Sequence, residues 1–243
     1  TITMKLKSSR LIFVMGLWAA LSTLFMLLVA LHAGPRTRAV MLMATGLAFF
    51  WIVLGGLLMR RCRDFIRQFV QSIRMDWRVK FVLFATLLAL LEEAVTVSMT
   101  NLAPLFGVRL GEAYITASAN YLDVVALHSV VVFVPMFIAW AWLLNRYAFS
   151  PNAVFLLFGL TGTLAEVSFG GFQQLAQLGF WVFVYGLMVY LPAYTLPAER
   201  AAQKPQWWRY PLAVVLPFVF AMPVAGIVGI LHPYRLHFPE IPP

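Results

Sequence analysis

The chain has 243 residues, of which 62% are hydrophobic and 11% are charged, and its formal net charge is +9. Ordinary soluble domains are about 45–50% apolar and about 25% charged, so the composition excludes a soluble globular protein and indicates one that uses the lipid bilayer as solvent. The basic residues lie between apolar runs rather than on one face with interleaved aromatics, which excludes a nucleic-acid partner and favours anionic lipids.

Seven stretches are long and apolar enough to cross a membrane, which takes about 20 residues of helix. In chain order they are residues 11–32, 39–59, 80–100, 123–145, 152–170, 175–196 and 211–231. The first resembles the start of a signal peptide, but its apolar part is too long for one and is expected to be retained. The expected fold is an all-α polytopic transmembrane bundle of about seven spans, forming a single domain over residues 1–243.

The distribution of Lys and Arg gives this bundle a direction. Of the 18 basic residues, all but Arg36, Arg38, Arg109 and Arg235 fall on the side of the N-terminus. The positive-inside rule then predicts a cytoplasmic N-terminus and an extracytoplasmic C-terminus. A bacterial or archaeal cytoplasmic membrane is the expected location. The lipid bilayer, anionic lipids at its cytoplasmic face and other membrane subunits are the expected partners.

Two segments outside the spans have their own character. In residues 60–79, apolar side chains recur at helical spacing among basic ones, which predicts an amphipathic helix on the cytoplasmic leaflet. Cys62, the only cysteine, lies there and excludes a disulfide or a cysteine zinc site within the chain. Residues 101–122 are too polar to face lipid. They predict an outer loop, a re-entrant turn, or a loop followed by an outward extension of the fourth helix, and in each case a candidate lid.

Ionisable side chains inside the spans mark the candidate site, because such residues are costly in a membrane. Glu92 and Glu93 lie in the third span, His128 in the fourth and Glu166 in the fifth, with Asp123 at the outer mouth of the fourth. At about 1.5 Å per residue from the cytoplasmic ends, the two adjacent glutamates lie roughly 18–20 Å up, Glu166 roughly 22 Å and His128 roughly 26 Å. These side chains are therefore expected at one height, in the outer half of the bilayer.

Helical spacing adds detail to this picture. Thr96 and Thr100 follow Glu92 at i+4 and i+8 and continue a polar stripe toward the outer surface. In a regular fourth helix, Asp123 and His128 point in different directions, so these two need not bind one object. All four histidines, His32, His128, His232 and His237, fall on or near the outer side.

Three kinds of chemistry fit these residues, and a structural role remains open beside them. Carboxylates in a membrane can carry protons or a cation in a transport-like protein. A divalent metal ion such as Mn, Fe or Zn suits a ligand set drawn from Glu92, Glu93, Asp123, His128 and Glu166. A glutamate can also act as a general base for hydrolysis, which would make Glu93, Glu92 and His128 catalytic. Alternatively, the acids only hold helices together in a non-catalytic subunit of a larger membrane complex.

A partial family resemblance supports the hydrolase interpretation. Glu92-Glu93 on a membrane helix, followed by His128 on the next, resembles the CAAX-protease and bacteriocin-processing family of intramembrane glutamic hydrolases. The resemblance implies that a glutamate activates water and that His128 assists. This chain lacks the Arg that follows the family's Glu pair, has Val124 where its Phe-x-x-x-His motif begins, and has no later His-x-x-x-Asn.

Overall fold

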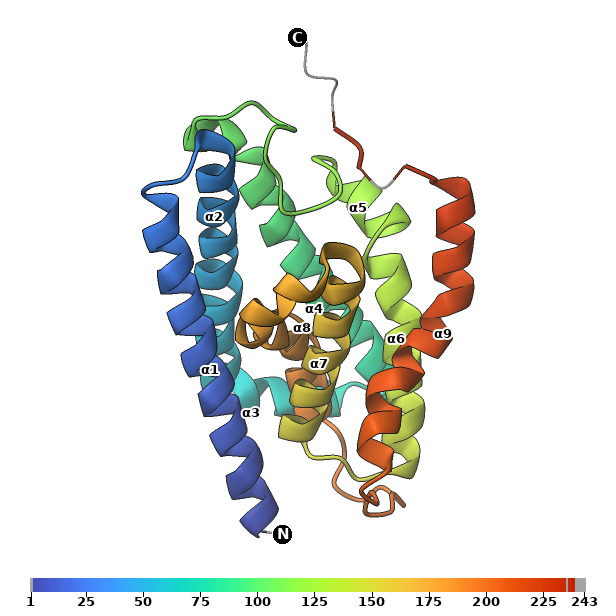
Figure 1. The fold of residues 1–243 in the computed structure, drawn as a ribbon. Helices are drawn as coiled ribbons and strands as arrows, with labels where there is room; N and C mark the ends of the chain where they lie inside the picture. The colour runs from blue at the N-terminus through green and yellow to red at the C-terminus, as the bar shows by residue number, and fades with distance from the viewer. Residues whose placement is uncertain (1, 235, 239–243) are drawn as a thin grey trace.

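The computed structural model describes residues 2–234 and 236–238, and this part of the chain is helical apart from loops and isolated β-bridges (Figure 1). Arg235, one of the predicted outer arginines, lies outside the described residues. The prediction of an all-α protein is confirmed. The elements in chain order are α1 (Ile2–Ala30), α2 (Pro35–Leu47), the π-helical η1 (Ala48–Gly55), α3 (Gly56–Ser72), α4 (Trp77–Asn101), η2 (Ala103–Phe106), α5 (Tyr121–Leu127), α6 (Val130–Arg146), α7 (Pro151–Gly170), η3 (Phe172–Gln177), α8 (Leu178–Tyr194) and α9 (Arg209–Leu231).

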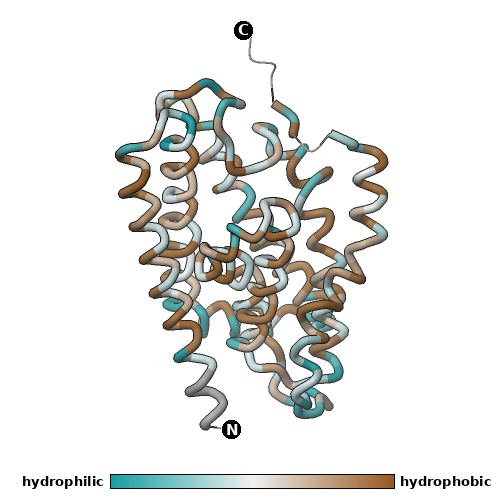
Figure 2. Tube along the Cα trace, viewed as in Figure 1, coloured by the Kyte–Doolittle hydropathy of each residue, from teal (hydrophilic) through white to brown (hydrophobic). Residues whose placement is uncertain are grey.

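Within the described residues, six helices are long and apolar enough to cross a membrane. The pair α5 and α6 passes the same test as one unit, bent by 44°, and gives a seventh span if it is counted. Figure 2 shows hydrophobic colouring along most of the helices and hydrophilic colouring mainly toward the two ends of the bundle. A bundle with this surface requires an apolar solvent, so the chain is a membrane protein.

The helices divide into a buried centre and an outer ring. Helix α8 contacts α1, α4 and α7, and 56% of its most apolar window is buried. The corresponding windows of α1 and α9 are only 11% and 17% buried, so most of their Leu, Val, Ile and Phe side chains point outward toward lipid. Helices α7 and α8 approach closely at Gly159, where a Cβ atom would lie 2.5 Å from the carbonyl oxygen of Val182.

The amphipathic segment predicted over residues 60–79 covers most of α3, which continues a longer helix, and then a short turn and the first residues of α4. Residues Pro35–Ser72 run as one helix of 38 residues, because Gly55 and Gly56 keep helical backbone angles and nothing interrupts the chain before Ile73. A short turn follows, and Asp76 caps α4 by accepting a hydrogen bond from the Arg78 backbone N–H at 2.8 Å. The apolar residues of α3 remain exposed, with Phe65 at 72% and Phe69 at 61%.

The outer segment 101–122 is a loop that packs back on α4 and then leads into α5. The Thr100 hydroxyl accepts a hydrogen bond from the Ile115 N–H at 3.3 Å, and the Asn101 side chain donates to the Ala119 carbonyl at 3.0 Å. A small core between α2, α4 and this loop consists of Ala39, Met43, Met99, Ala103, Val108 and Ala113. Apart from η2, the segment is a loop up to Asn120, and α5 begins at Tyr121, two residues before the predicted start of the fourth span.

Candidate functional site

Three acids meet in the centre of the bundle. Glu92 and Glu93 project from α4 and are only 5% and 7% exposed, while Glu166 projects from α7 and is partly buried. Their carboxylates are close enough to interact electrostatically with one another. The structure therefore brings these three predicted site residues together, and we call them the acid cluster.

Hydroxyl groups surround the acid cluster. Thr96 donates to Glu92 at 2.8 Å, one helical turn along the polar stripe that the sequence predicted. Tyr185 of α8 donates to Glu166, and the Ser129 hydroxyl, which donates to the Val124 carbonyl at 3.3 Å, lies near Glu93. No Lys, Arg or His in the described part of the chain forms an ion pair with these carboxylates. Three negative charges without a positive partner would be costly in a low-dielectric interior.

A glycine makes room for the hydroxyl that binds Glu166. Gly162 lies one turn before Glu166 on α7, and the ring of Tyr185 fills the space that its side chain would occupy. The same ring contacts Phe133 of α6 edge-on, with ring centroids 5.9 Å apart. Tyr185 is thus fixed between two helices, and its hydroxyl has a defined position.

Asp123 and His128 lie on either side of a break in the predicted fourth span. The Asn120 side chain caps α5 by accepting from the N–H groups of Leu122 and Asp123, at 3.0 and 3.4 Å. Helix α5 then ends at Leu127, and His128 leaves helical geometry with φ −134° and ψ −68°. The expectation that His128 points away from Asp123 was wrong, because it assumed a regular helix. The break places His128 Nε2 3.7 Å from Asp123 Oδ2.

Two histidines from the C-terminal end join this pair. His232 follows the last residue of α9, and His237 lies five residues further along. His237 Nδ1 lies 2.9 Å from Asp123 Oδ2 and 3.4 Å from His128 Nε2, and His237 Nε2 lies 3.2 Å from His232 Nδ1. Each of the four residues can offer a ligand atom such that all four atoms lie within 4.8 Å of one another. We call Asp123, His128, His232 and His237 the His/Asp cluster.

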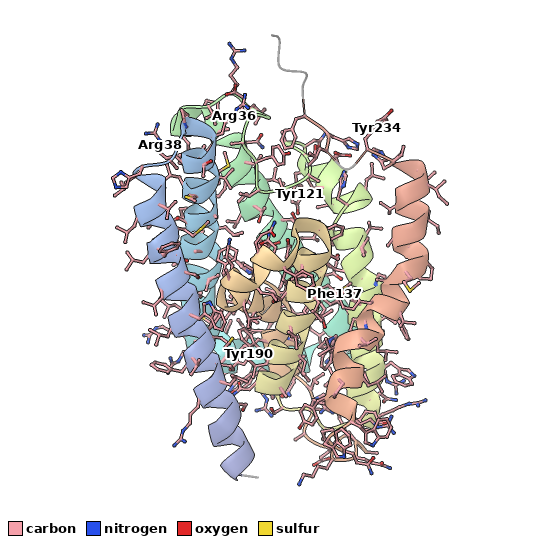
Figure 3. The ribbon with its side chains drawn as sticks, viewed as in Figure 1. Arg36, Arg38, Tyr121, Phe137, Tyr190 and Tyr234 are labelled. Atoms are coloured by element: carbon pink, nitrogen blue, oxygen red, sulfur yellow. The ribbon has the colours of Figure 1, made fainter. Side chains whose placement is uncertain are left out.

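The outer loop holds the C-terminal segment in place. The backbone N–H of His237 donates to the Ala117 carbonyl at 2.8 Å, and Ser118 pairs with His237 in an isolated β-bridge. The rings of Tyr114 and Phe238 stack with centroids 4.8 Å apart. Helix α5, the outer loop and the end of α9 lie at one end of the bundle, where Figure 3 also labels Arg36, Arg38 and Tyr234. The predicted lid thus contacts the His/Asp cluster through its own backbone.

The distances within the His/Asp cluster match those of a metal site. Zinc bonds to His nitrogen and carboxylate oxygen are about 2.0–2.1 Å long, so neighbouring ligand atoms of a tetrahedral site lie about 3.3 Å apart. Asp123 Oδ2, His128 Nε2 and His237 Nδ1 form a triangle with sides of 2.9, 3.4 and 3.7 Å. The other nitrogen of His237, Nε2, lies within hydrogen-bonding distance of His232 Nδ1 and is left to orient the ring if Nδ1 binds a metal.

Comparison of the chain with known protein families, curated proteins and solved structures gives no match. The chemistry of its own side chains therefore carries the functional argument. The five predicted metal ligands separate into two groups: Glu92, Glu93 and Glu166 in the acid cluster, and Asp123 and His128 in the His/Asp cluster. Ser129, which directly follows His128 in the chain, lies near Glu93.

Sequence reasoning missed His232 and His237 as site residues. The available signal was the position of the histidines, which all fall near the outer side of the predicted topology. Topology alone does not show which of the four histidines meet in the His/Asp cluster and which one lies outside it. His32, at the end of α1, is exposed and is not in the His/Asp cluster.

Proposed function

We propose that this membrane protein binds a divalent transition-metal ion through Asp123, His128 and His237, with His232 orienting His237. The triangle of ligand atoms, with sides of 2.9–3.7 Å, is the observation that carries the proposal. Imidazole nitrogen and carboxylate oxygen are ligands that suit Zn²⁺, and also Mn and Fe. Zn²⁺ is the first choice because three or four such ligands at this spacing match its tetrahedral geometry.

The test is the metal content of the purified protein, prepared without a polyhistidine tag. Metal is stripped with a chelator, zinc is added back, and the bound zinc is measured after desalting by mass spectrometry. The wild type is expected to hold about one ion per chain, and His237→Gln and Asp123→Asn to hold none above background. His32→Gln is the matched control, because it removes an outer histidine that lies outside the His/Asp cluster. Equal zinc loss in the control and in His237→Gln would contradict the proposal.

Metal-dependent hydrolysis is the second candidate function, and the position of His232 favours it. If His232 accepts a hydrogen bond from His237 rather than binding the metal, only three protein ligands remain. A zinc ion with three protein ligands keeps a fourth position for water. It lowers the pKa of that water, so that a hydroxide is present to attack a substrate at neutral pH. The Glu93 carboxylate lies beside Ser129, next along the chain from the ligand His128, and is the acid best placed to exchange protons with the site.

The acid cluster is proposed to carry protons or a cation beneath the metal site. Thr96 donates to Glu92 and Tyr185 donates to Glu166, and the described cations of the chain form no ion pair with these carboxylates. Infrared spectra can test this, because a protonated carboxyl group has a carbonyl stretching band that a carboxylate lacks. Glu93→Gln should remove part of that band. A spectrum with carboxylate bands only, unchanged by sodium or potassium, would contradict the proposal.

The orientation follows from the basic residues. The positive-inside rule places the end of the bundle that carries α3 and the start of α9 in the cytoplasm, and the His/Asp cluster on the extracytoplasmic side of a bacterial or archaeal membrane. Cysteine labelling with a membrane-impermeant reagent in intact cells tests this, after Cys62 is replaced by Ser. A cysteine at exposed His32 should be labelled, and one at exposed Arg74 should not.

A further inference from the structure

A basic and aromatic rim surrounds the start of α9, at the end of the bundle opposite the His/Asp cluster (Figure 3). The Arg209 guanidinium lies 3.3 Å from the centroid of the Trp208 ring and 4.7 Å from that of Tyr147. Arg200 lies 5.6 Å from the ring of Trp77, at the start of α4. A guanidinium within about 6 Å of an aromatic ring face is attracted to the ring electrostatically, which favours a fixed position for the side chain.

Backbone pairing holds the rim together. The Gln203 N–H donates to the Arg146 carbonyl at 2.9 Å, and the Ala148 N–H donates back to the Gln203 carbonyl at 2.8 Å. This pairing fixes the connection between α8 and α9 against the end of α6. Arg146 itself stacks on Trp142 at 4.0 Å. We call Arg146, Arg200 and Arg209 the arginine rim.

The charge of the arginine rim is not neutralised by the protein. In the described residues, none of its three arginines forms an ion pair, and Glu199, next to Arg200, pairs with none of them. The Nε atoms of Arg200 and Arg209 are buried without a hydrogen-bond partner. Burial also lowers the pKa of Arg200. Guanidinium groups without a counter-ion in the chain attract anions at the membrane surface through their remaining N–H groups, which points to an anion outside the chain.

The surroundings identify the kind of anion. Trp207 is 82% exposed beside the rim, and Val215 and Val219 on the following turns of α9 are more than half exposed. Exposed tryptophan next to an outward apolar helix is typical of the membrane interface, where headgroups meet acyl chains. A soluble phosphate would leave this apolar surface uncovered. A phospholipid matches both the cationic side chains and the apolar surface, because its phosphate can bind the arginines while its acyl chains lie along α9.

We propose that the arginine rim is a binding site for one anionic phospholipid, with the headgroup phosphate bound by Arg200 and Arg209. This goes beyond the general attraction of basic residues to anionic membranes, because it assigns a retained lipid to particular side chains. Arg63 and Arg67 lie over Tyr194 at 5.3 and 5.8 Å, and Arg78 lies over Trp77 at 5.7 Å, but among the described arginines only Arg200 and Arg209 have a buried Nε without a partner. Arg60 and Arg74, on and after α3, are exposed and lie over no ring.

Native mass spectrometry of the detergent-purified protein tests the site, with phosphatidylglycerol and phosphatidylcholine as competing probes. Each basic residue at a membrane surface favours anionic lipid by about fivefold, so Arg200 and Arg209 together should give a preference of about 30-fold. Arg200→Gln/Arg209→Gln should abolish this preference. The control Arg60→Gln/Arg74→Gln removes the same charge from the same end and should keep it. Arg200→Lys/Arg209→Lys keeps the charge and should retain most of it.

Three outcomes would overturn the proposal. The first is equal loss of the preference in the control, which would mean that net charge alone attracts the lipid. The second is displacement of phosphatidylglycerol by millimolar inorganic phosphate, which would indicate a site for a soluble anion. The third is a wild type with no preference between the two lipids. Thermal unfolding of each variant separates loss of binding from loss of folding.

Discussion

His237 Nδ1 lies 2.9 Å from Asp123 Oδ2, although 114 residues separate the two in the chain. This contact joins the segment after α9 to the first turn of α5, and His128 and His232 complete the group around it. A metal ion at this position would connect the C-terminal segment, the broken fourth span and, through Ala117, the outer loop. The predictions below concern this connection and the acid cluster beneath it.

The two C-terminal histidines are predicted to differ in their effect on zinc binding. His237→Gln removes a ligand and should abolish the site, whereas His232→Gln removes a partner of that ligand and should weaken zinc binding by about 10–100-fold without changing the stoichiometry. Competition with a fluorescent zinc chelator gives the affinities. If both variants lose zinc completely, His232 is a fourth ligand and the site is a closed structural one.

Zinc is predicted to fix the C-terminal segment on the outer loop. The His237 N–H is bonded to the Ala117 carbonyl, and its exchange with deuterium should slow when zinc binds. At a zinc concentration about 100 times the Kd, the slowing can reach about 100-fold. Hydrogen exchange followed by peptide mass spectrometry measures it in the C-terminal peptide. Peptides from α1, which has no contact with the His/Asp cluster, serve as the internal control and should be unaffected.

Gly162→Ala is predicted to destabilise the protein through Tyr185. The new Cβ would overlap the tyrosine ring, and the displacement should cost about 1–3 kcal/mol of unfolding free energy. Gly226→Ala is the matched control, because a Cβ at that position of α9 has nothing within 4 Å, and a helical alanine is favoured over glycine. Thermal unfolding in detergent compares the two. Similar losses in both variants would contradict the prediction, because a Cβ atom at Gly226 displaces no neighbour.

Removing the Tyr185 hydroxyl tests the hydrogen bond to Glu166 directly. Tyr185→Phe keeps the ring and leaves a buried carboxyl without its donor, which should lower stability by about 1 kcal/mol. Tyr190→Phe removes a hydroxyl from the same helix whose partner is the surface residue Arg63, and it should have a smaller effect. Urea or thermal unfolding of both variants checks the order. The reverse order would show that the acid cluster does not depend on Tyr185.

The parts of the site that lie within single helices could be predicted from the sequence. Thr96 bonds Glu92 at i+4, as the polar stripe indicates, because helical geometry alone places them on one face. Glu166 comes close to Glu92 and Glu93, as the common depth indicates, because the bilayer sets the length of each span. A common depth in the bilayer, however, does not show which side chains contact the acids. Tyr185 and Ser129 contact them only because α6 and α8 pack against α4 and α7.

The sequence by itself determined the membrane-spanning helical architecture, since apolar runs of fixed length leave few alternatives in a bilayer. Tertiary structure decided the composition of the His/Asp cluster. A regular helix keeps Asp123 and His128 apart, and only the break after Leu127 brings them together. His232 and His237 join them from the far end of the chain, held by the outer loop. Contacts of this kind depend on how helices pack and where they bend, which residue periodicity does not encode.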